Sequence, residues 1–109
     1  MSAEGFKFLA AVLCVDKRTC LVMLESQLFL RVAEEVVRPY LRAHLLTLFQ
    51  NLCYNLSVVV DMNTMENQLV ELMNVLLKLY QQTREHDYLN LLKEQLQEID
   101  NEDIVLMLI

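Results

Sequence analysis

The stretch RPYLRAHLLTLFQNLCYNLSVVVDMN, residues 38–63, decides the fold class of this chain. Its apolar residues recur mostly at steps of three and four positions: Leu41, Leu45, Leu48, Phe49, Leu52, Leu56 and Val59. Residues at these steps share one face of an α-helix, which has about 3.6 residues per turn. Polar residues such as Arg42 and Gln50 occupy the other directions. The stretch therefore predicts a helix over residues 40–60 whose apolar face is covered by another part of the protein.

A membrane-spanning helix is an alternative interpretation of the same stretch. Crossing a bilayer takes about 20 residues that are mostly apolar on every side. Polar side chains interrupt this stretch along its length: Arg42, His44, Gln50, Asn51, Asn55 and Ser57. We therefore expect no membrane helix and no binding to a membrane.

The composition extends the helical prediction to the whole chain. The 109 residues include one glycine and one proline, Gly5 and Pro39. β-Sandwiches, barrels and phosphate-binding loops need these residue types at their turns, so their scarcity argues against such folds. The same apolar periodicity predicts further helices over residues 3–15, 19–37, 64–84, 87–99 and 101–109. We expect one all-α domain, residues 1–109, of about six antiparallel helices in which sequential helices lie side by side.

Stretches of the chain repeat each other at a distance of 39 residues. LAAVLCV at residues 9–15 aligns with LFQNLCY at residues 48–54, and DYLNLLK follows at residues 87–93. The pair Leu-Cys falls at the same place in the first two stretches, and Leu-Leu takes that place in the third. A period near 40 residues is typical of helical repeats that stack into a solenoid.

The octapeptide LFQNLCYN, residues 48–55, resembles the buried third helix of armadillo repeats, in which an Asn-Leu-Cys sequence recurs. The resemblance implies a short armadillo-like α-solenoid, or a fragment of a longer one. Because the glycine that punctuates an armadillo repeat is missing, a two-helix, HEAT-like unit and a plain helical bundle both remain open. In armadillo proteins the matching asparagine lines a groove that holds an extended peptide. The resemblance thus implies Asn51 and Asn55 as partner-binding residues.

The net charge of −6 comes entirely from the end of the chain. Residues 1–84 carry eight acidic and eight basic side chains, whereas residues 85–109 carry seven acidic side chains and Lys93. Such an acidic C-terminal segment is repelled by nucleic acid and attracts basic surfaces. Glu94 and Glu98 are four residues apart and share a helix face. We therefore expect no nucleic-acid binding, and these two glutamates are candidate contacts for a basic partner.

The sequence offers little for catalysis or for metal binding. The three cysteines, Cys14, Cys20 and Cys53, form no C-x-x-C pair, which favours free thiols in the reducing cytoplasm or nucleus. His44 and Cys53 are nine residues apart on one predicted helix and face directions about half a turn apart. Zinc needs about four ligands, usually in closely spaced pairs, which two isolated histidines do not supply. We expect no enzyme, no metal and no cofactor.

Together these features predict a protein–protein interaction module or scaffold subunit. It is expected to bind a basic or amphipathic helical segment, or a peptide, of a partner protein in an apolar helical groove. The apolar stripe of residues 64–84 supplies area, and the acidic segment supplies electrostatic steering. The apolar C-terminus, with Ile104, Leu106 and Ile109, is a further candidate contact.

Two other classes of protein compete with this prediction. One is an obligate homo-oligomeric helical bundle that a second copy completes through residues 101–109. The other is a small intracellular enzyme whose site lies between helices and uses Cys53 or His44.

Overall fold

The computed structural model describes residues 2–59 and 66–98, and these residues are almost entirely helical. They form six α-helices and two short 3₁₀ helices: α1 (Ala3–Val15), α2 (Lys17–Glu25), α3 (Leu28–Ala33), η1 (Glu34–Val37), η2 (Pro39–Leu41), α4 (Arg42–Val59), α5 (Glu66–Thr83) and α6 (His86–Glu98). No strand occurs in this part of the chain. The all-α prediction is confirmed, while the helix predicted over residues 101–109 lies outside the described residues.

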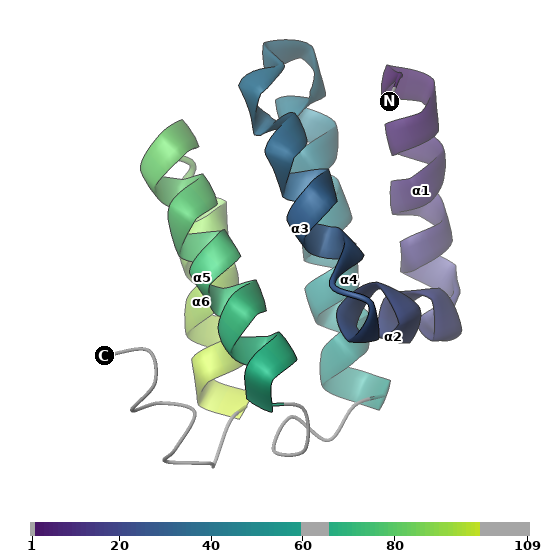
Figure 1. Cartoon of the computed structure of the whole chain (residues 1–109), viewed down its shortest axis with the longest axis vertical. Coiled ribbons are helices and arrows are strands. Elements are labelled where there is room, and N and C mark those ends of the chain that lie inside the picture. Colours follow the sequence, from purple (N-terminus) through teal and green to yellow (C-terminus); the bar gives the residue numbers. More distant parts are fainter. Residues whose placement is uncertain (1, 60–65, 99–109) are drawn as a thin grey trace.

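The helices lie in two layers (Figure 1). One layer is a row in which α1 packs on α4 and α4 packs on α6. The second layer holds α3 and α5, which pack on each other in front of that row. The three helices of the row run in one direction, and α3 and α5 run in the opposite direction (Figure 1). The short helix α2 lies crosswise between the end of α1 and the start of α3, and it contacts α1, α3, α4 and α5.

The helix predicted over residues 19–37 is broken by a turn at Ser26 and Gln27. Gln27 has a left-handed backbone, with φ 58° and ψ 27°, which costs an L-residue about 1–2 kcal/mol. The Ser26 hydroxyl donates to the Val22 carbonyl at 2.6 Å, where it competes with the helical hydrogen bonds. Apolar residues keep their helical spacing across this turn, so the sequence pattern does not reveal it. Because of this turn, α3 runs alongside the other long helices, whereas α2 lies crosswise to them (Figure 1).

Asp16 separates α1 from α2 and sets a new chain direction. Its Oδ1 accepts hydrogen bonds from the backbone N–H groups of Arg18 and Thr19 at 3.0 and 3.3 Å, as an N-cap does. The Thr19 hydroxyl donates to Oδ2 at 2.9 Å, and these bonds hold the pKa of Asp16 below its usual value. Because α2 turns away, α1 packs mainly on α4, and the expected pairing of sequential helices holds for α5 and α6.

The apolar face predicted for residues 40–60 lies at the centre of the core. Its fully buried members are Leu41, Leu45, Leu48, Phe49, Leu52 and Leu56. Burying one such side chain contributes about 1.5–3 kcal/mol to folding. The rings of Phe49 and Tyr88 meet edge to face with centroids 6.4 Å apart, which positions α6 against α4. This face is therefore covered by protein, and none of the described helices is long and apolar enough to cross a bilayer.

The apolar stripe of α5, expected to supply binding area, also faces the core. Its buried members are Leu69, Leu72, Met73 and Leu76. Among the large apolar side chains described on α5, Leu77 is the exposed one, at 40%. These four side chains therefore hold α5 in the fold, and they do not supply the exposed apolar area that binding to a partner needs.

Candidate functional site

The two asparagines singled out in the sequence join α4 to the end of α1. The Asn51 side-chain amide donates to the Ala10 carbonyl at 2.9 Å. The Asn55 amide donates to the carbonyls of Leu13 at 2.6 Å and Cys14 at 3.2 Å. The carbonyls of Leu13 and Cys14 lie in the last turn of α1 and have no partner within that helix, so the bonds from Asn55 satisfy them. These bonds also hold α1 parallel to α4, because the donor with the higher residue number on α4, Asn55, bonds to acceptors with higher residue numbers on α1 than Asn51 does.

A buried thiol completes this contact. The Cys20 Sγ donates to the Leu13 carbonyl at 3.2 Å, and Cys20 is fully buried. Burial raises the pKa of Cys20, and the negative charge of Asp16 adds to that effect. The thiol therefore stays protonated and acts as a hydrogen-bond donor to the end of α1.

Burial distinguishes the two asparagines. Asn55 is 4% exposed, and its amide is engaged by α1. Asn51 is half-buried and lines a groove of about 540 Å³ between α1 and α4, together with Lys7, Cys14 and His44. The structure thus gives Asn55 a packing role and leaves Asn51 at the edge of a surface groove. Peptide binding by either residue stays a prediction.

Of the candidate residues in the C-terminal segment, the structure describes the side chain of Glu94, which lies on a different helix from the asparagines. Glu94 is exposed on α6, which packs on α4 apart from α1. Glu98 is the last residue of α6, and its side chain lies outside the described part of the structure. Ile104, Leu106 and Ile109 also lie outside the described residues.

The burial of Cys53 bears on the enzyme alternative. Burial raises the pKa of Cys53 to about 12, and the negative charge of Glu94 adds to that effect. A cysteine nucleophile acts as a thiolate, which this environment disfavours at neutral pH. His44 is half-buried and lines the α1–α4 groove, whereas Cys53 is 1% exposed. Within residues 2–59 and 66–98, no group of three or more His, Cys, Asp or Glu side chains is placed to hold a metal ion.

An apolar groove lies between α1, α2 and α3, and we call it the α1–α3 groove. It has a volume of about 450 Å³ and is lined by Phe6, Leu9, Thr19, Val22, Met23, Leu28, Arg31, Val32 and Glu35. Its floor is buried, with Phe6, Met23 and Val32 at most 8% exposed. Its rim is open, with Val22 48% and Leu28 44% exposed. A floor and a rim of aliphatic and aromatic side chains are what a helix-binding groove presents.

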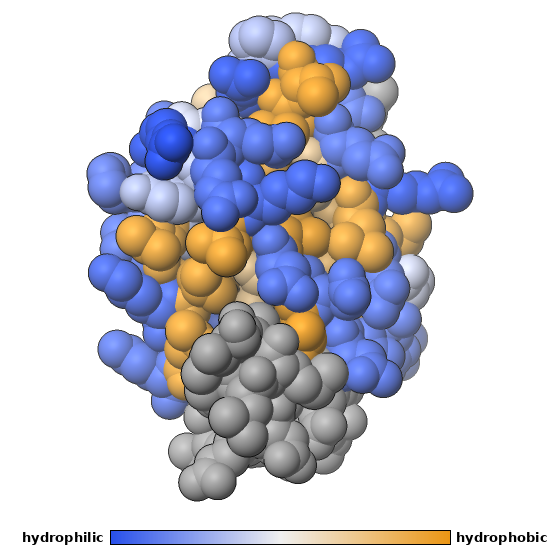
Figure 2. Space-filling view, turned by 60° about the vertical axis from the view of Figure 1, so that its left-hand side comes forward, coloured by the Kyte–Doolittle hydropathy of each residue, from blue (hydrophilic) through white to orange (hydrophobic). Residues whose placement is uncertain are grey.

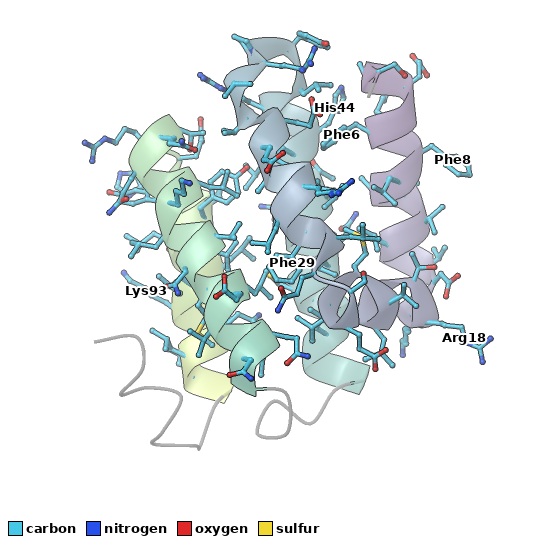
Figure 3. The ribbon with its side chains drawn as sticks, in the orientation of Figure 1. Phe6, Phe8, Arg18, Phe29, His44 and Lys93 are labelled. Carbon is cyan, nitrogen blue, oxygen red and sulfur yellow. The ribbon has the colours of Figure 1, made fainter. Side chains whose placement is uncertain are left out.

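The side chains of α1 face opposite ways around this groove (Figure 3). Phe6 points toward the neighbouring helices and is fully buried, whereas Phe8 points away from them and is 72% exposed. At the groove's polar edge, Glu35 pairs with the Arg38 Nε at 2.8 Å. Arg31 is exposed and lines the same edge. The groove therefore has one polar edge, while Phe8 lies outside it.

A second groove, of about 490 Å³, runs between α3, η1 and α5. Val37, Val75 and Leu79 contribute apolar surface there, and Glu34, Lys78 and Gln82 contribute polar groups. Figure 2 turns the α5–α6 side forward, and its hydrophobic side chains form patches that are divided by hydrophilic ones. This side of the molecule is therefore more mixed in character than the α1–α3 groove.

No protein-family model, curated protein or solved structure matches this chain. The likeness of residues 48–55 to an armadillo helix accordingly stays a prediction.

Sequence reasoning missed the residues that form the rim of the α1–α3 groove. Val22 and Leu28 both fall within the helix predicted over residues 19–37, where they read as ordinary apolar positions. They border a groove because the chain turns at Gln27 between them. Ser26, a residue that favours turns, was the available signal.

Proposed function

We propose that this chain is a non-enzymatic protein-interaction module that binds a helical segment of a partner protein in the α1–α3 groove. The observation that carries the proposal is the groove itself, which has helices on three sides, a buried apolar floor and two half-exposed aliphatic side chains at its rim. Covering that rim removes apolar surface from water, which favours binding by about 25 cal/mol per Å² before the costs of association.

We further propose that the stack is a short helical repeat. Three features support this: the 39-residue period of the sequence, the parallel direction of α1, α4 and α6, and the equivalent places of α3 and α5 in the second layer. The bond from Asn51 to Ala10 spans 41 residues, close to one period. The proposal favours the armadillo- or HEAT-like interpretation over a plain bundle, because α1, α4 and α6 would occupy equivalent positions in successive repeats.

The enzyme alternative has less support in this arrangement. Cys53 is buried with a raised pKa, and the half-buried His44 lines a different groove. The homo-oligomer alternative rests on residues 101–109, which lie outside the described residues, so it stays a prediction. Steering of a basic partner by Glu94 also stays a prediction, and it is separate from the α1–α3 groove because Glu94 lies on α6.

Affinity capture with three forms of the chain tests the proposal. The double variant Val22→Glu/Leu28→Glu places two charges on the rim, whereas Phe8→Glu places one on an apolar side chain of α1 outside the groove. We expect partners to be retained by the wild type and by Phe8→Glu and to be lost from the double variant. Circular dichroism of each form establishes that all three remain helical.

The decisive step is direct binding of the captured protein's helical segment. Its affinity for the double variant should be weaker by a factor of about ten or more, because a desolvated charge is left at the interface. Equal retention and equal affinity for all three forms would remove the α1–α3 groove as the binding site.

A further inference from the structure

The turn between α2 and α3 interrupts a stretch whose apolar residues keep helical spacing. Leu24 and Leu28 lie four residues apart on either side of it, as neighbours on one face of a continuous helix do. Gln27 adopts a left-handed backbone there, with φ 58°, and its side chain makes no capping hydrogen bond to α3. A straight helix through this point would remove that strain and would offer the first N–H groups of α3 the carbonyls of α2. The turn is therefore strained, and the same residues are compatible with a straight helix.

The part of the chain before the turn is held together by its own contacts. Asp16 caps the start of α2 with its carboxylate. The Cys20 thiol of α2 donates to the Leu13 carbonyl of α1 at 3.2 Å. We call residues 2–25, which contain α1 and α2, the arm, and we call α3 to α6 the body. Because these bonds lie within the arm, they do not depend on the conformation of the turn.

The arm packs on the body mainly through α4. Phe6, Leu13 and Leu24 of the arm are fully buried. Asn51 and Asn55 of α4 donate to carbonyls in the second half of α1. An arm that swung away from its own body would expose buried apolar surface and leave these carbonyls without their donors, which is unfavourable. The surface that the arm leaves on the body fits one further segment of known structure, which is the arm of a second copy of the chain.

We propose that the turn at Ser26 and Gln27 is a hinge, and that its straightening lets two copies of the chain exchange arms to form a dimer. In this dimer the arm of each copy packs on α4 of the other, so that Asn51 of one copy donates to Ala10 of the other. The arm–body contacts away from the hinge are kept, and the hinge backbone returns to helical hydrogen bonding. Short hinges under strain favour such exchange. The exchange does not involve residues 101–109, and it does not depend on what the α1–α3 groove binds.

Substitutions at the hinge should shift the balance of monomer and dimer in opposite directions. Gln27→Gly relieves the strain of the turn and disfavours a continuous helix, whereas Ser26→Ala/Gln27→Ala favours a continuous helix. Because each dimer holds two straightened hinges, we expect Gln27→Gly to lower the dimer association constant about a hundredfold or more. The alanine double variant should raise it about tenfold. Gln50→Ala, at an exposed position of α4, is the control and should leave the constant unchanged.

The association constants are measured after refolding, because an arm has to leave its own body before it can be exchanged. Each form is refolded from urea at a series of protein concentrations, and the mass of the products is determined by size-exclusion chromatography with light scattering. Circular dichroism establishes that each form is helical. At one concentration the dimer fraction should rise from Gln27→Gly to the wild type and from the wild type to Ser26→Ala/Gln27→Ala.

A nitroxide label on Cys14 tests whether the arm is the exchanged part. Cys14 is exposed, while Cys20 and Cys53 are buried, so the native thiol of Cys14 takes the label. The Cys14 carbonyl lies 3.2 Å from the side-chain nitrogen of Asn55. A labelled chain is refolded with a ¹⁵N-enriched Cys14→Ser chain, and the monomer and dimer fractions are separated. We expect the side-chain amide signal of Asn55 in the enriched copy to lose intensity in the dimer and to keep it in the monomer.

Three results would overturn the proposal. Equal association constants for the wild type and both hinge variants would show that the turn does not control assembly. Dimers in which Asn55 keeps its full signal would show that the copies pair through another face. Monomers in every form and at every concentration would exclude arm exchange altogether.

Discussion

Replacing Asn55 by alanine should destabilise the fold without involving any partner. Asn55 is 4% exposed and donates to two carbonyls at the end of α1, at 2.6 and 3.2 Å. Leaving buried carbonyls without their donor costs about 1–3 kcal/mol. The Leu13 carbonyl keeps the weak Cys20 Sγ–H donor at 3.2 Å, so we expect a loss of about 2 kcal/mol in the free energy of unfolding.

Urea denaturation followed by circular dichroism measures this loss, and thermal unfolding gives a second value. For a domain of this size, a loss of about 2 kcal/mol lowers the melting temperature by roughly 10 °C. Asn51→Ala should cost less, about 1 kcal/mol, because Asn51 is half-buried and makes one such bond at 2.9 Å. Gln50→Ala is the matched control, since Gln50 is exposed on the same helix and should change stability by less than about 0.5 kcal/mol.

The result that would refute this reasoning is an Asn55→Ala protein with the same urea midpoint as Gln50→Ala. Loss of partner binding by such a stable variant would favour the peptide-contact role that the armadillo resemblance implies for Asn55. Equal losses for Asn51→Ala and Asn55→Ala would show that the difference in burial does not control the cost.

Three further predictions follow from the backbone and from the thiols. Gln27→Gly should raise the free energy of unfolding by about 1 kcal/mol, because glycine adopts the left-handed backbone without strain, whereas Gln50→Gly in the middle of α4 should lower it by about 1 kcal/mol in the same denaturation assay. Burial raises the pKa of Cys53 from 9.0 to about 12 and also raises the pKa of Cys20, so above about pH 9 the unfolded state loses these protons before the folded state does. Urea denaturation should therefore show the free energy of unfolding falling by up to ~1.4 kcal/mol per pH unit for each thiol. Cys53→Ala should make this fall shallower, and an unchanged slope would argue against a buried, protonated Cys53. Thiol titration of the native protein should modify Cys14 rapidly and the other two cysteines only on unfolding, and rapid reaction of all three would contradict the burial of α4 against its neighbours.

The elements that the sequence predicts well are those with a long, unbroken apolar period. Residues 40–60 and 64–84 have this property, and α4 and α5 occupy most of them. A long apolar stripe at helical spacing can be buried on one side only if the backbone forms an α-helix. Residues 3–15 behave in the same way, with Ser2 accepting from the Gly5 N–H at 3.1 Å as the N-cap. Local patterns of this kind need no knowledge of the rest of the fold.

The candidate site was less predictable because it depends on contacts between distant residues. Asn51 and Asn55 were singled out by resemblance, but their acceptors on α1 lie 41 and 42 residues away, which no local pattern reveals. The groove likewise depends on the backbone at Gln27, where one non-glycine residue adopts a left-handed conformation. The apolar stripe of α5 was recognised correctly as a stripe, but whether a stripe meets the core or a partner is decided by the neighbouring helices.

Chemical-shift mapping of the ¹⁵N-labelled chain with the helical segment of the captured partner tests the central claim most directly. The account predicts that the largest shifts gather on the lining of the α1–α3 groove, at Leu9, Val22, Leu28 and Val32, with Phe8 little affected. Shifts that gather on α5 and α6, or along the α1–α4 groove beside Asn51, would contradict it.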